Sequence, residues 1–248
     1  MAILVTRPHP DNETTAAALR ARDLTVVLAP MLRLEEVAFR IDADLKFGAI
    51  MVTSANALRA IAGHELLPQL LDLPLFAVGD HTAETATRLG FRTVMSASGD
   101  ATALRNLLVA QAKARTLSPA QGLLYLAGAD LARNLAGELN GHGFDVHTVT
   151  TYRMTPVQTL SAAAIETFAQ DGFAAVMHYS RRSARAFLEA ARGAGIEITA
   201  LGIPQVCISS AVADVVREAG APRVLAADTP DEIGLFAALD RALTPVSR

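Results

Sequence analysis

Short runs of consecutive apolar residues alternate along the chain with stretches in which apolar residues recur every three or four positions. The short runs predict β-strands, and the longer periodic stretches predict α-helices. Strands are expected at residues 2–6, 25–29, 49–53, 75–78, 93–96, 123–127, 145–150, 174–179, 206–209 and 223–226. Helices are expected between them, among others at residues 11–22, 55–61, 82–89, 131–140, 183–191 and 211–219. Many strands are apolar at successive positions, as in AIMV and GLLYLA, which is typical of parallel sheets covered by helices on both faces.

The pattern also repeats itself in the order A, B, A, B. Residues 1–33 resemble residues 121–153, and residues 47–110 resemble residues 173–242. A period this long indicates duplication of a domain rather than a solenoid repeat. The general likeness of all βα units is the alternative explanation.

The ten expected strands fit two five-stranded sheets, each built from one A unit and one B unit. Either the units pair in sequence, or the middle pair forms one lobe and the outer pair forms the other. The units are separated near residues 31–46 and 151–171, where MLRLEEVAF and TTYRMTPVQ are expected to continue the preceding strands as a linker. The pattern leaves the pairing open. A cleft between two such lobes would be a common place for a ligand.

Composition narrows the class of protein. The chain has 248 residues, a net charge of −3 and 51% hydrophobic residues, so it can bury a sizeable core and lacks a broad basic field for nucleic acid. Its one cysteine, Cys207, excludes an intramolecular disulfide and suits a reducing compartment. The apolar residues before Arg7 are too few for a signal peptide, and no apolar run approaches the ~18 residues of a membrane span. We therefore expect a cytoplasmic protein without nucleic-acid or membrane partners.

Small hydroxyl residues gather where the predicted strands end, which is where ligands lie in open parallel sheets. The segments there are Thr6-Arg7-Pro8, Thr53-Ser54-Ala55-Asn56, Gly79-Asp80-His81-Thr82, Gly128-Ala129-Asp130, Tyr179-Ser180-Arg181-Arg182 and Ser209-Ser210-Ala211. Arginines on or just after these loops are Arg7, Arg133, Arg181, Arg182 and Arg185. Each hydroxyl can simply cap a helix, and each arginine can simply be solvated. Several helix starts facing one cleft would instead bind a ligand with many carboxylates.

Motifs of other enzyme classes are missing. The sequence has no Gly-rich phosphate loop, no G-x-S-x-G and no spacing of metal ligands, so no metal site is expected. His178 and Cys207 lie inside predicted strands and are expected to pack in the core. The better polar candidates are His81, in a strand-end loop, and Tyr152, which opens a crossing segment and either donates a hydrogen bond into a cleft or packs against the linker.

Five segments, in a fixed order, carry a resemblance to a known family. They are VTRP at 5–8, VTSANAL at 52–58, AVGDHTAETATRLGF at 77–91, AGADLARNLAGELNGHGFDV at 127–146 and TTYRM at 150–154. Each segment alone is loose, but their order and spacing together are fairly specific. They resemble the uroporphyrinogen-III synthase family over essentially the whole chain.

The resemblance implies an α/β fold of two flavodoxin-like lobes, each a five-stranded parallel sheet flanked by helices, in the exchanged arrangement and joined by a two-stranded linker. It implies a discontinuous outer lobe of residues 1–33 plus 154–248, an inserted lobe of residues 37–150, and linkers near 31–46 and 151–171. It also implies the dehydrating cyclisation of hydroxymethylbilane, a linear tetrapyrrole with eight carboxylates, with inversion of the last pyrrole ring. Such an enzyme is a lyase of porphyrin and heme biosynthesis and needs no cofactor.

Residues carried over from the family define an expected site. Tyr152 matches the family's cleft tyrosine and is the expected catalytic residue, as a hydrogen-bond donor that assists departure of the substrate hydroxyl. Substrate-binding residues are expected at Arg7, Thr53, Ser54, Asn56, Thr82 and Ser180, which match cleft positions of the family, and at the strand-end residues Gly79, His81, Gly128, Arg133, Ser209 and Ser210.

Two positions depart from the family pattern. Val212 stands where the family often has threonine, so Ser209 or Ser210 is the candidate to replace that hydroxyl. Ala127 stands where the family often has arginine, so Arg133 is expected to bear more of the anion binding. These departures leave a second function open, a non-catalytic two-lobed cytosolic ligand-binding or regulatory paralogue. A nucleotide-sugar enzyme is disfavoured because no Gly-rich loop is present.

The expected partner is hydroxymethylbilane. The resemblance also suggests a monomer that makes transient contact with the enzyme of the preceding pathway step.

Overall fold

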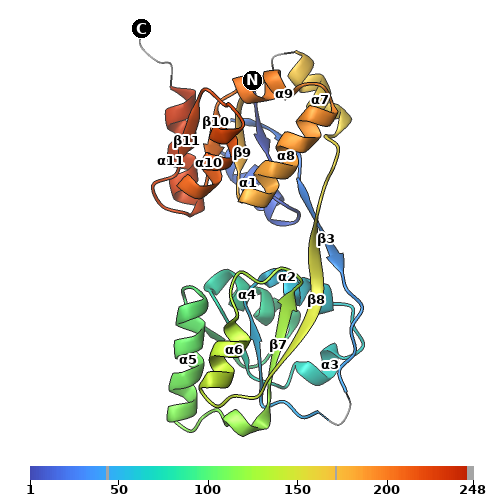
Figure 1. The fold of residues 1–248 in the computed structure, drawn as a ribbon, viewed down its shortest axis with the longest axis vertical. Coiled ribbons are helices and arrows are strands. Elements are labelled where there is room, and N and C mark those ends of the chain that lie inside the picture. The colour runs from blue at the N-terminus through green and yellow to red at the C-terminus, as the bar shows by residue number, and fades with distance from the viewer. Residues whose placement is uncertain (43–44, 171, 245–248) are drawn as a thin grey trace. The chain divides into compact units, whose positions relative to one another are not determined.

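The computed structural model describes residues 1–248 except 43–44, 171 and 245–248 (Figure 1). The chain divides into two compact units. We call Met1–Arg33 with Thr155–Arg248 the outer unit and Leu34–Met154 the inserted unit. Both are α/β structures with parallel sheets flanked by helices, as the apolar pattern predicts.

The strands of the outer unit's sheet are β1 (Ala2–Val5), β2 (Thr25–Leu28), β9 (Phe173–His178), β10 (Gln205–Cys207) and β11 (Val224–Ala226). Its helices are α1 (Asp11–Arg20), α7 (Ala162–Ala169), α8 (Arg181–Gly193), α9 (Glu197–Gly202), α10 (Ser210–Glu218) and α11 (Glu232–Leu243). The strand order is β11-β10-β9-β1-β2, and neighbouring strands are parallel. The first two strands of the chain therefore share a sheet with its last three.

Alternate residues of β1 face opposite sides of that sheet. Leu4 belongs to the core formed with α7, α8 and α10, whereas Ile3 and Val5 pack with residues of α1 and α11. All four residues of β1 are buried. Because both faces are covered, the strand has no polar position, which accounts for the uninterrupted AILV.

The strands of the inserted unit's sheet are β3 (Leu32–Glu36), β4 (Ala49–Val52), β5 (Leu75–Ala77), β6 (Val94–Ser96), β7 (Leu123–Gly128) and β8 (Val146–Pro156). Its helices are α2 (Ala55–Ile61), α3 (Leu67–Leu70), α4 (Asp80–Leu89), α5 (Ala101–Lys113) and α6 (Leu135–Gly141), with the 3-10 helix η1 (Pro119–Gln121). The order is β3-β8-β7-β4-β5-β6. One face carries α5 and α6, which lie together in Figure 1, and the other carries α2, α3 and α4.

The prediction of five strands per sheet is correct for the outer unit and wrong for the inserted unit, whose sheet has six. The additional strand is β3, which lies beside β8. The backbone N–H of Val37 donates to the Thr151 carbonyl at 2.9 Å, and that of Val157 donates to the Met31 carbonyl at 3.0 Å. The partners run in opposite order, so β3 and β8 are antiparallel. The segment expected only as a linker is thus an edge strand, and the division between the units passes through both strands.

Two element boundaries differ from the expected ones for local reasons. The helix expected at 131–140 begins only at Leu135, because the Asn134 side chain accepts a hydrogen bond from Gly137 N at 3.0 Å and caps the helix there. The strand expected at 145–150 continues to Pro156 as β8, because β3 supplies backbone partners beyond the end of β7.

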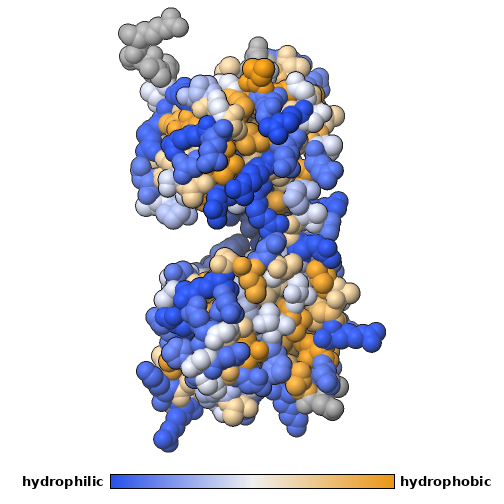
Figure 2. All heavy atoms as spheres, viewed as in Figure 1, coloured by the Kyte–Doolittle hydropathy of each residue, from blue (hydrophilic) through white to orange (hydrophobic). Residues whose placement is uncertain are grey.

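The surface in Figure 2 is largely hydrophilic with scattered hydrophobic residues, as expected when most apolar side chains lie in the cores. Among the described residues, no helix has the length and apolar character needed to cross a membrane.

Candidate functional site

Helix starts at the strand ends use two of the predicted serines as caps. Ser54 Oγ accepts a hydrogen bond from Asn56 N at 3.2 Å, and Ser180 Oγ accepts one from Ser183 N at 3.0 Å. Gly79 and Ser209 also occupy N-cap positions, but neither makes a side-chain cap bond. The capping explanation therefore applies to Ser54 and Ser180. At α4 and α10 the N-cap residue leaves the first backbone N–H groups without a side-chain acceptor. Free N–H groups at the positive end of a helix favour binding of an anion.

A threonine and a tyrosine meet near the carboxyl edge of the inserted sheet. Thr53, just after β4, and Tyr125, on the neighbouring strand β7, are joined by a hydrogen bond of 3.0 Å between their hydroxyl oxygens. Burial raises the pKa of Tyr125, and the nearby Tyr152 phenol acts in the same direction. Tyr125 therefore stays a neutral phenol that can hold Thr53 in place.

Tyr152 packs against Gly128. The two residues are register partners on β8 and β7, just after an irregularity in the pairing at Ala127 and Gly128. A Cβ atom on Gly128 would lie 2.7 Å from Tyr152 Cζ and 2.9 Å from its hydroxyl oxygen. The backbone N–H of Ala129 also donates to the Tyr152 carbonyl at 2.8 Å. The structure thus brings the expected catalytic residue and Gly128 together, and only glycine leaves room for this ring.

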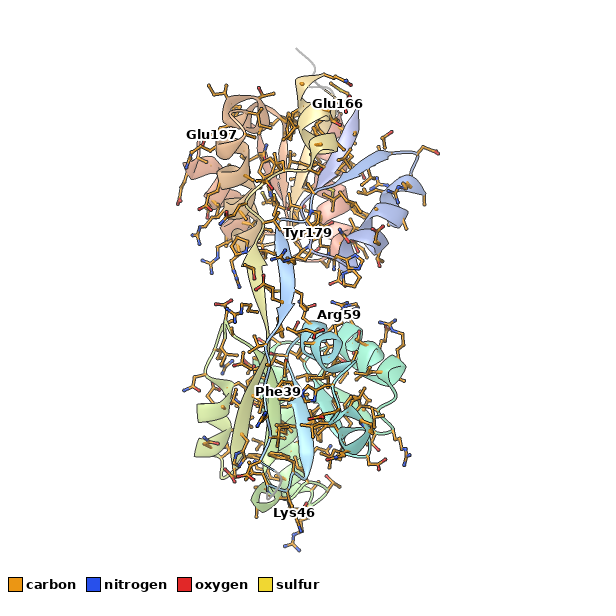
Figure 3. The ribbon with its side chains drawn as sticks, turned by 90° about the vertical axis from the view of Figure 1, so that its right-hand side faces the viewer. Phe39, Lys46, Arg59, Glu166, Tyr179 and Glu197 are labelled. Carbon is orange, nitrogen blue, oxygen red and sulfur yellow. The ribbon has the colours of Figure 1, made fainter. Side chains whose placement is uncertain are left out.

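Polar side chains from α2, α4 and β8 form a second group in the same unit. Asn56 Oδ1 accepts a hydrogen bond from Arg59 Nη1 at 2.7 Å, and Asn56 Nδ2 contacts Met154 Sδ at 3.6 Å. Arg59 Nη2 lies 3.5 Å from His81 Nε2. Sequence reasoning placed Asn56 and His81 in the site but missed Arg59, which Figure 3 labels on α2. Its spacing of three residues from Asn56 on a helix was the available signal.

Thr82 and Arg133 have other surroundings. Thr82 is buried, and its backbone N–H donates to the Gly79 carbonyl at 3.1 Å. Arg133 donates from Nε and Nη2 to the Glu138 carboxylate and from Nη1 to Thr102 Oγ1 at 2.5 Å. The hydrogen bonds from Arg133, followed by that from Arg105, lower the pKa of Glu138 against the opposing effect of desolvation. Arg133 is therefore held by an internal carboxylate.

In the outer unit, Arg7 is the centre of a compact polar cluster. Its Nη1 donates to Thr15 Oγ1 at 3.0 Å and to Glu232 Oε1 at 3.2 Å. Its Cζ lies 4.9 Å from the centre of the Tyr179 ring, a cation–π geometry. Desolvation is the main reason that the pKa of Tyr179 rises to about 12, so this phenol is neutral. The sequence analysis included Tyr179 in a strand-end segment but assigned it no role. Glu232 could not be predicted as a neighbour of Arg7, because the two residues are far apart in the chain.

Val212 on α10, which departs from the family pattern, lies in the core, and the two serines near it do not. Val212 is only 4% exposed and packs in the apolar cluster, whereas Ser209 is half-buried and Ser210 is exposed. The side chain at 212 is therefore enclosed by apolar groups. Ser209 and Ser210 are the hydroxyl residues at this helix start.

His178 and Cys207 lie in the core, which confirms their expected places. Gln205 donates from Nε2 to two carbonyl oxygens, of Ala200 and Ile203, so its Oε1 accepts from His178 Nε2 at 2.8 Å. Burial lowers the pKa of His178 to about 4 and raises the pKa of the Cys207 thiol to about 12. Both groups are neutral near pH 7, and neither is available as a nucleophile or base. Within the described part of the chain, no three His, Cys, Asp or Glu side chains are placed to hold a metal ion.

Comparisons with known proteins bear on the family and on the fold of this chain. The family model described as uroporphyrinogen-III synthase HemD matches residues 13–237. The crystal structure of uroporphyrinogen-III synthetase from Helicobacter pylori is similar with a TM-score of 0.66 and 18% identity, over 98% of this chain and 99% of that chain. A mutant uroporphyrinogen III synthase from the extremely thermophilic bacterium Thermus thermophilus has a TM-score of 0.53 and 18% identity, over 98% and 99% of the two chains. At this identity the likeness concerns the fold. Among curated proteins, no sequence matches significantly.

The fold and the strand-end clusters define an α/β protein with hydroxyl, amide and guanidinium groups near the carboxyl edges of its sheets. The extent of the family match decides which enzyme class this is. The chain belongs to the uroporphyrinogen-III synthase family, whose members are enzymes of porphyrin and heme biosynthesis that act on a tetrapyrrole.

Proposed function

We propose that the chain is a uroporphyrinogen-III synthase that converts hydroxymethylbilane into uroporphyrinogen III without a cofactor. The reaction removes one water molecule, closes the ring and inverts the last pyrrole, so the enzyme is a cyclising hydro-lyase. The family match over residues 13–237 supports the reaction class.

In the proposed mechanism, Tyr152 donates a hydrogen bond to the substrate hydroxyl as it departs, which leaves an azafulvene. The azafulvene carbon then bonds to the substituted carbon of the last pyrrole to form a spiro intermediate. The bond from that carbon to the methylene bridge of the preceding pyrrole then breaks, which gives a second azafulvene. The methylene of this azafulvene bonds to the unsubstituted α-carbon of the last pyrrole, and loss of the proton from that carbon restores aromaticity. Because the azafulvene is intrinsically reactive, we propose that positioning contributes more to the rate than proton transfer does.

The single observation that carries this assignment to residues is the place of Tyr152, whose ring lies directly against Gly128 at the end of β7. This close approach to the backbone restricts the ring to few orientations. A phenol held in this way is suited to meet a departing hydroxyl.

The proposal assigns carboxylate binding to groups in both units. In the inserted unit these are Thr53, Ser54, Asn56, Gly79, His81, Thr82, Gly128 and Arg133, and in the outer unit Arg7, Ser180, Ser209 and Ser210. Helix starts and guanidinium groups both stabilise carboxylates. Arg133 donates from all three of its nitrogens to Glu138 and Thr102, whereas Arg7 donates to Thr15 and Glu232 from Nη1, so we expect Arg133 to contribute less than Arg7.

The finer organisation is part of the same proposal. It takes the two units as flavodoxin-like lobes, residues 1–33 plus 154–248 and residues 37–150, with linkers near 31–46 and 151–171. It takes the protein as a cytoplasmic monomer that meets the enzyme of the preceding step transiently.

A coupled assay tests the proposal. Porphobilinogen and hydroxymethylbilane synthase generate the substrate, the chain is added, and the products are oxidised and separated into type I and type III isomers. We expect mainly type III in the presence of the chain and only the spontaneous type I without it. Type I alone with correctly folded protein would refute the proposed function.

A further inference from the structure

The guanidinium of Arg7 contacts side chains from three separate parts of the outer unit. Thr15 on α1 and Glu232 on α11 both accept from its Nη1, at 3.0 and 3.2 Å, and its Cζ lies 4.9 Å from the centre of the Tyr179 ring, just after β9. Thr15 Oγ1 in turn donates to Glu232 Oε1 at 2.5 Å. Nη1 therefore has two acceptors on one side, which fixes the orientation of the whole guanidinium group.

Glu232 is itself held by the start of a helix. It is the first residue of α11, and the preceding residue, Asp231, caps that helix by accepting from Gly234 N at 2.7 Å. A carboxylate in the first helical turn is stabilised by the helix dipole. Glu232 is thus a fixed negative charge, contributed by a segment 225 residues after Arg7.

Arg7 is not sealed by these contacts. Its side chain is 26% exposed and that of Glu232 is 33% exposed, whereas Thr15 is fully buried. Tyr179, which Figure 3 labels near the end of β9, covers one face of the guanidinium. Asp11 Oδ2 lies 4.0 Å from Nη2, an ion-pair distance without a hydrogen bond, so a second and more distant carboxylate also faces Arg7. A carboxylate arriving from solvent would therefore meet an oriented cation whose charge Glu232 already offsets.

We propose that Glu232 is a positioning residue that orients Arg7 and sets how strongly Arg7 binds a carboxylate of the substrate. The inference rests on the proposed function for the identity of that substrate. Glu232 acts in two opposing ways. Its oxygen fixes the guanidinium, which favours binding, and its charge offsets that of Arg7, which weakens binding.

A charge-neutral variant separates these two effects. Glu232→Gln keeps an oxygen that can accept from Thr15 and Arg7 and removes only the charge. For a partly exposed pair we expect KM to fall about two- to fivefold with kcat unchanged. We expect the Kd of uroporphyrin III, an octacarboxylate used as a binding probe, to fall by the same factor. Glu232→Asp keeps the charge, and its Kd should stay within about twofold of that of the unmodified chain.

A double-mutant cycle with Arg7→Gln makes the test specific, because two residues in contact couple and distant ones do not. In the Arg7→Gln background, adding Glu232→Gln should change neither KM nor Kd. Asp240→Asn is the matched control, because it removes a carboxylate from the same helix where it pairs with Arg22. It should leave both constants unchanged.

Three results would overturn the inference. The first is an unchanged Kd in Glu232→Gln. The second is the same fall in Kd when Glu232→Gln is added to Arg7→Gln, and the third is an equal fall in Kd in Asp240→Asn. Circular dichroism and thermal melting of each variant establish that it is folded. If the unmodified chain forms only the type I isomer, the proposed function fails, and the uroporphyrin series still decides the coupling between Glu232 and Arg7.

Discussion

Adding one methyl group at Gly128 should displace the Tyr152 ring. In Gly128→Ala the new Cβ would lie 2.7 Å from Tyr152 Cζ, whereas carbon atoms normally approach to about 3.5–4.0 Å. Because the ring is half-buried, it can relieve the clash by moving about 1 Å, at a stability cost of about 1 kcal/mol, the low end for overpacking.

A ring displaced by about 1 Å loses at most its hydrogen bond to the substrate, which is worth about 1.4 kcal/mol in the activation free energy, or about tenfold in rate. We therefore expect Gly128→Ala to melt close to the unmodified protein and to form type III isomer up to about tenfold more slowly. The rate of type III formation, corrected for spontaneous type I, and the Tm are the two measurements.

Gly141→Ala is the matched control. It lies in the same unit, and a Cβ there would meet nothing within 4 Å. It should keep full activity and lose no stability, because alanine is favoured over glycine in a helix. A Gly128→Ala protein with the unmodified rate and isomer ratio would refute the argument that the position of the Tyr152 ring matters.

Three further predictions concern single side chains. Tyr152→Phe should lower kcat about tenfold, the value of one hydrogen bond, and a folded variant with no measurable turnover would contradict the dominance of positioning. Because burial lowers the pKa of His178 from 6.5 to about 4, the unfolded state binds more protons between these values. Protonation of His178 in the unfolded state should therefore lower the free energy of unfolding by about 2 kcal/mol between pH 7 and pH 5. Urea titrations at several pH values measure this change, and an equal dependence of the unfolding free energy on pH in His178→Gln would disprove that His178 is its source. Cys207, buried and with a pKa of about 12, should react with a thiol reagent only as fast as the protein opens, so rapid labelling of the native protein would be inconsistent with its burial.

Local pattern was sufficient to predict the α/β class and most of the elements. The runs AILV and AIMV predict buried strands because the two-sided covering of a parallel sheet removes polar positions, and β1 and β4 are buried throughout. Pattern predicted an extended segment at β3 but not its place as an edge strand of the inserted sheet, because LRLEE mixes charged and apolar residues. The pairing of β1 with β9 was equally beyond reach, since strand order depends on contacts between distant segments.

The candidate site was predictable only where the chain places its parts close together. The strand-end rule drew attention to Thr53 and Gly128. Tyr152 stood out as a polar residue that opens a crossing segment, and the resemblance gave it a catalytic role. Tyr125 was missed because it lies within a buried strand, where only the pairing with β4 brings its hydroxyl to Thr53. Glu232 was missed because nothing in its own segment marks it, and only the folded outer unit brings it to Arg7.

The position of β1 beside β9 also sets the order in which the chain can mature during synthesis. Leu4 has to wait for its partner Val176, so the first segment leaves the ribosome long before the strand that completes its sheet. Most of the inserted unit, by contrast, is a continuous segment that can close on itself first. β1 can pair with β2 early, but its other edge must stay open, and exposed to wrong partners, until translation has passed the middle of the chain.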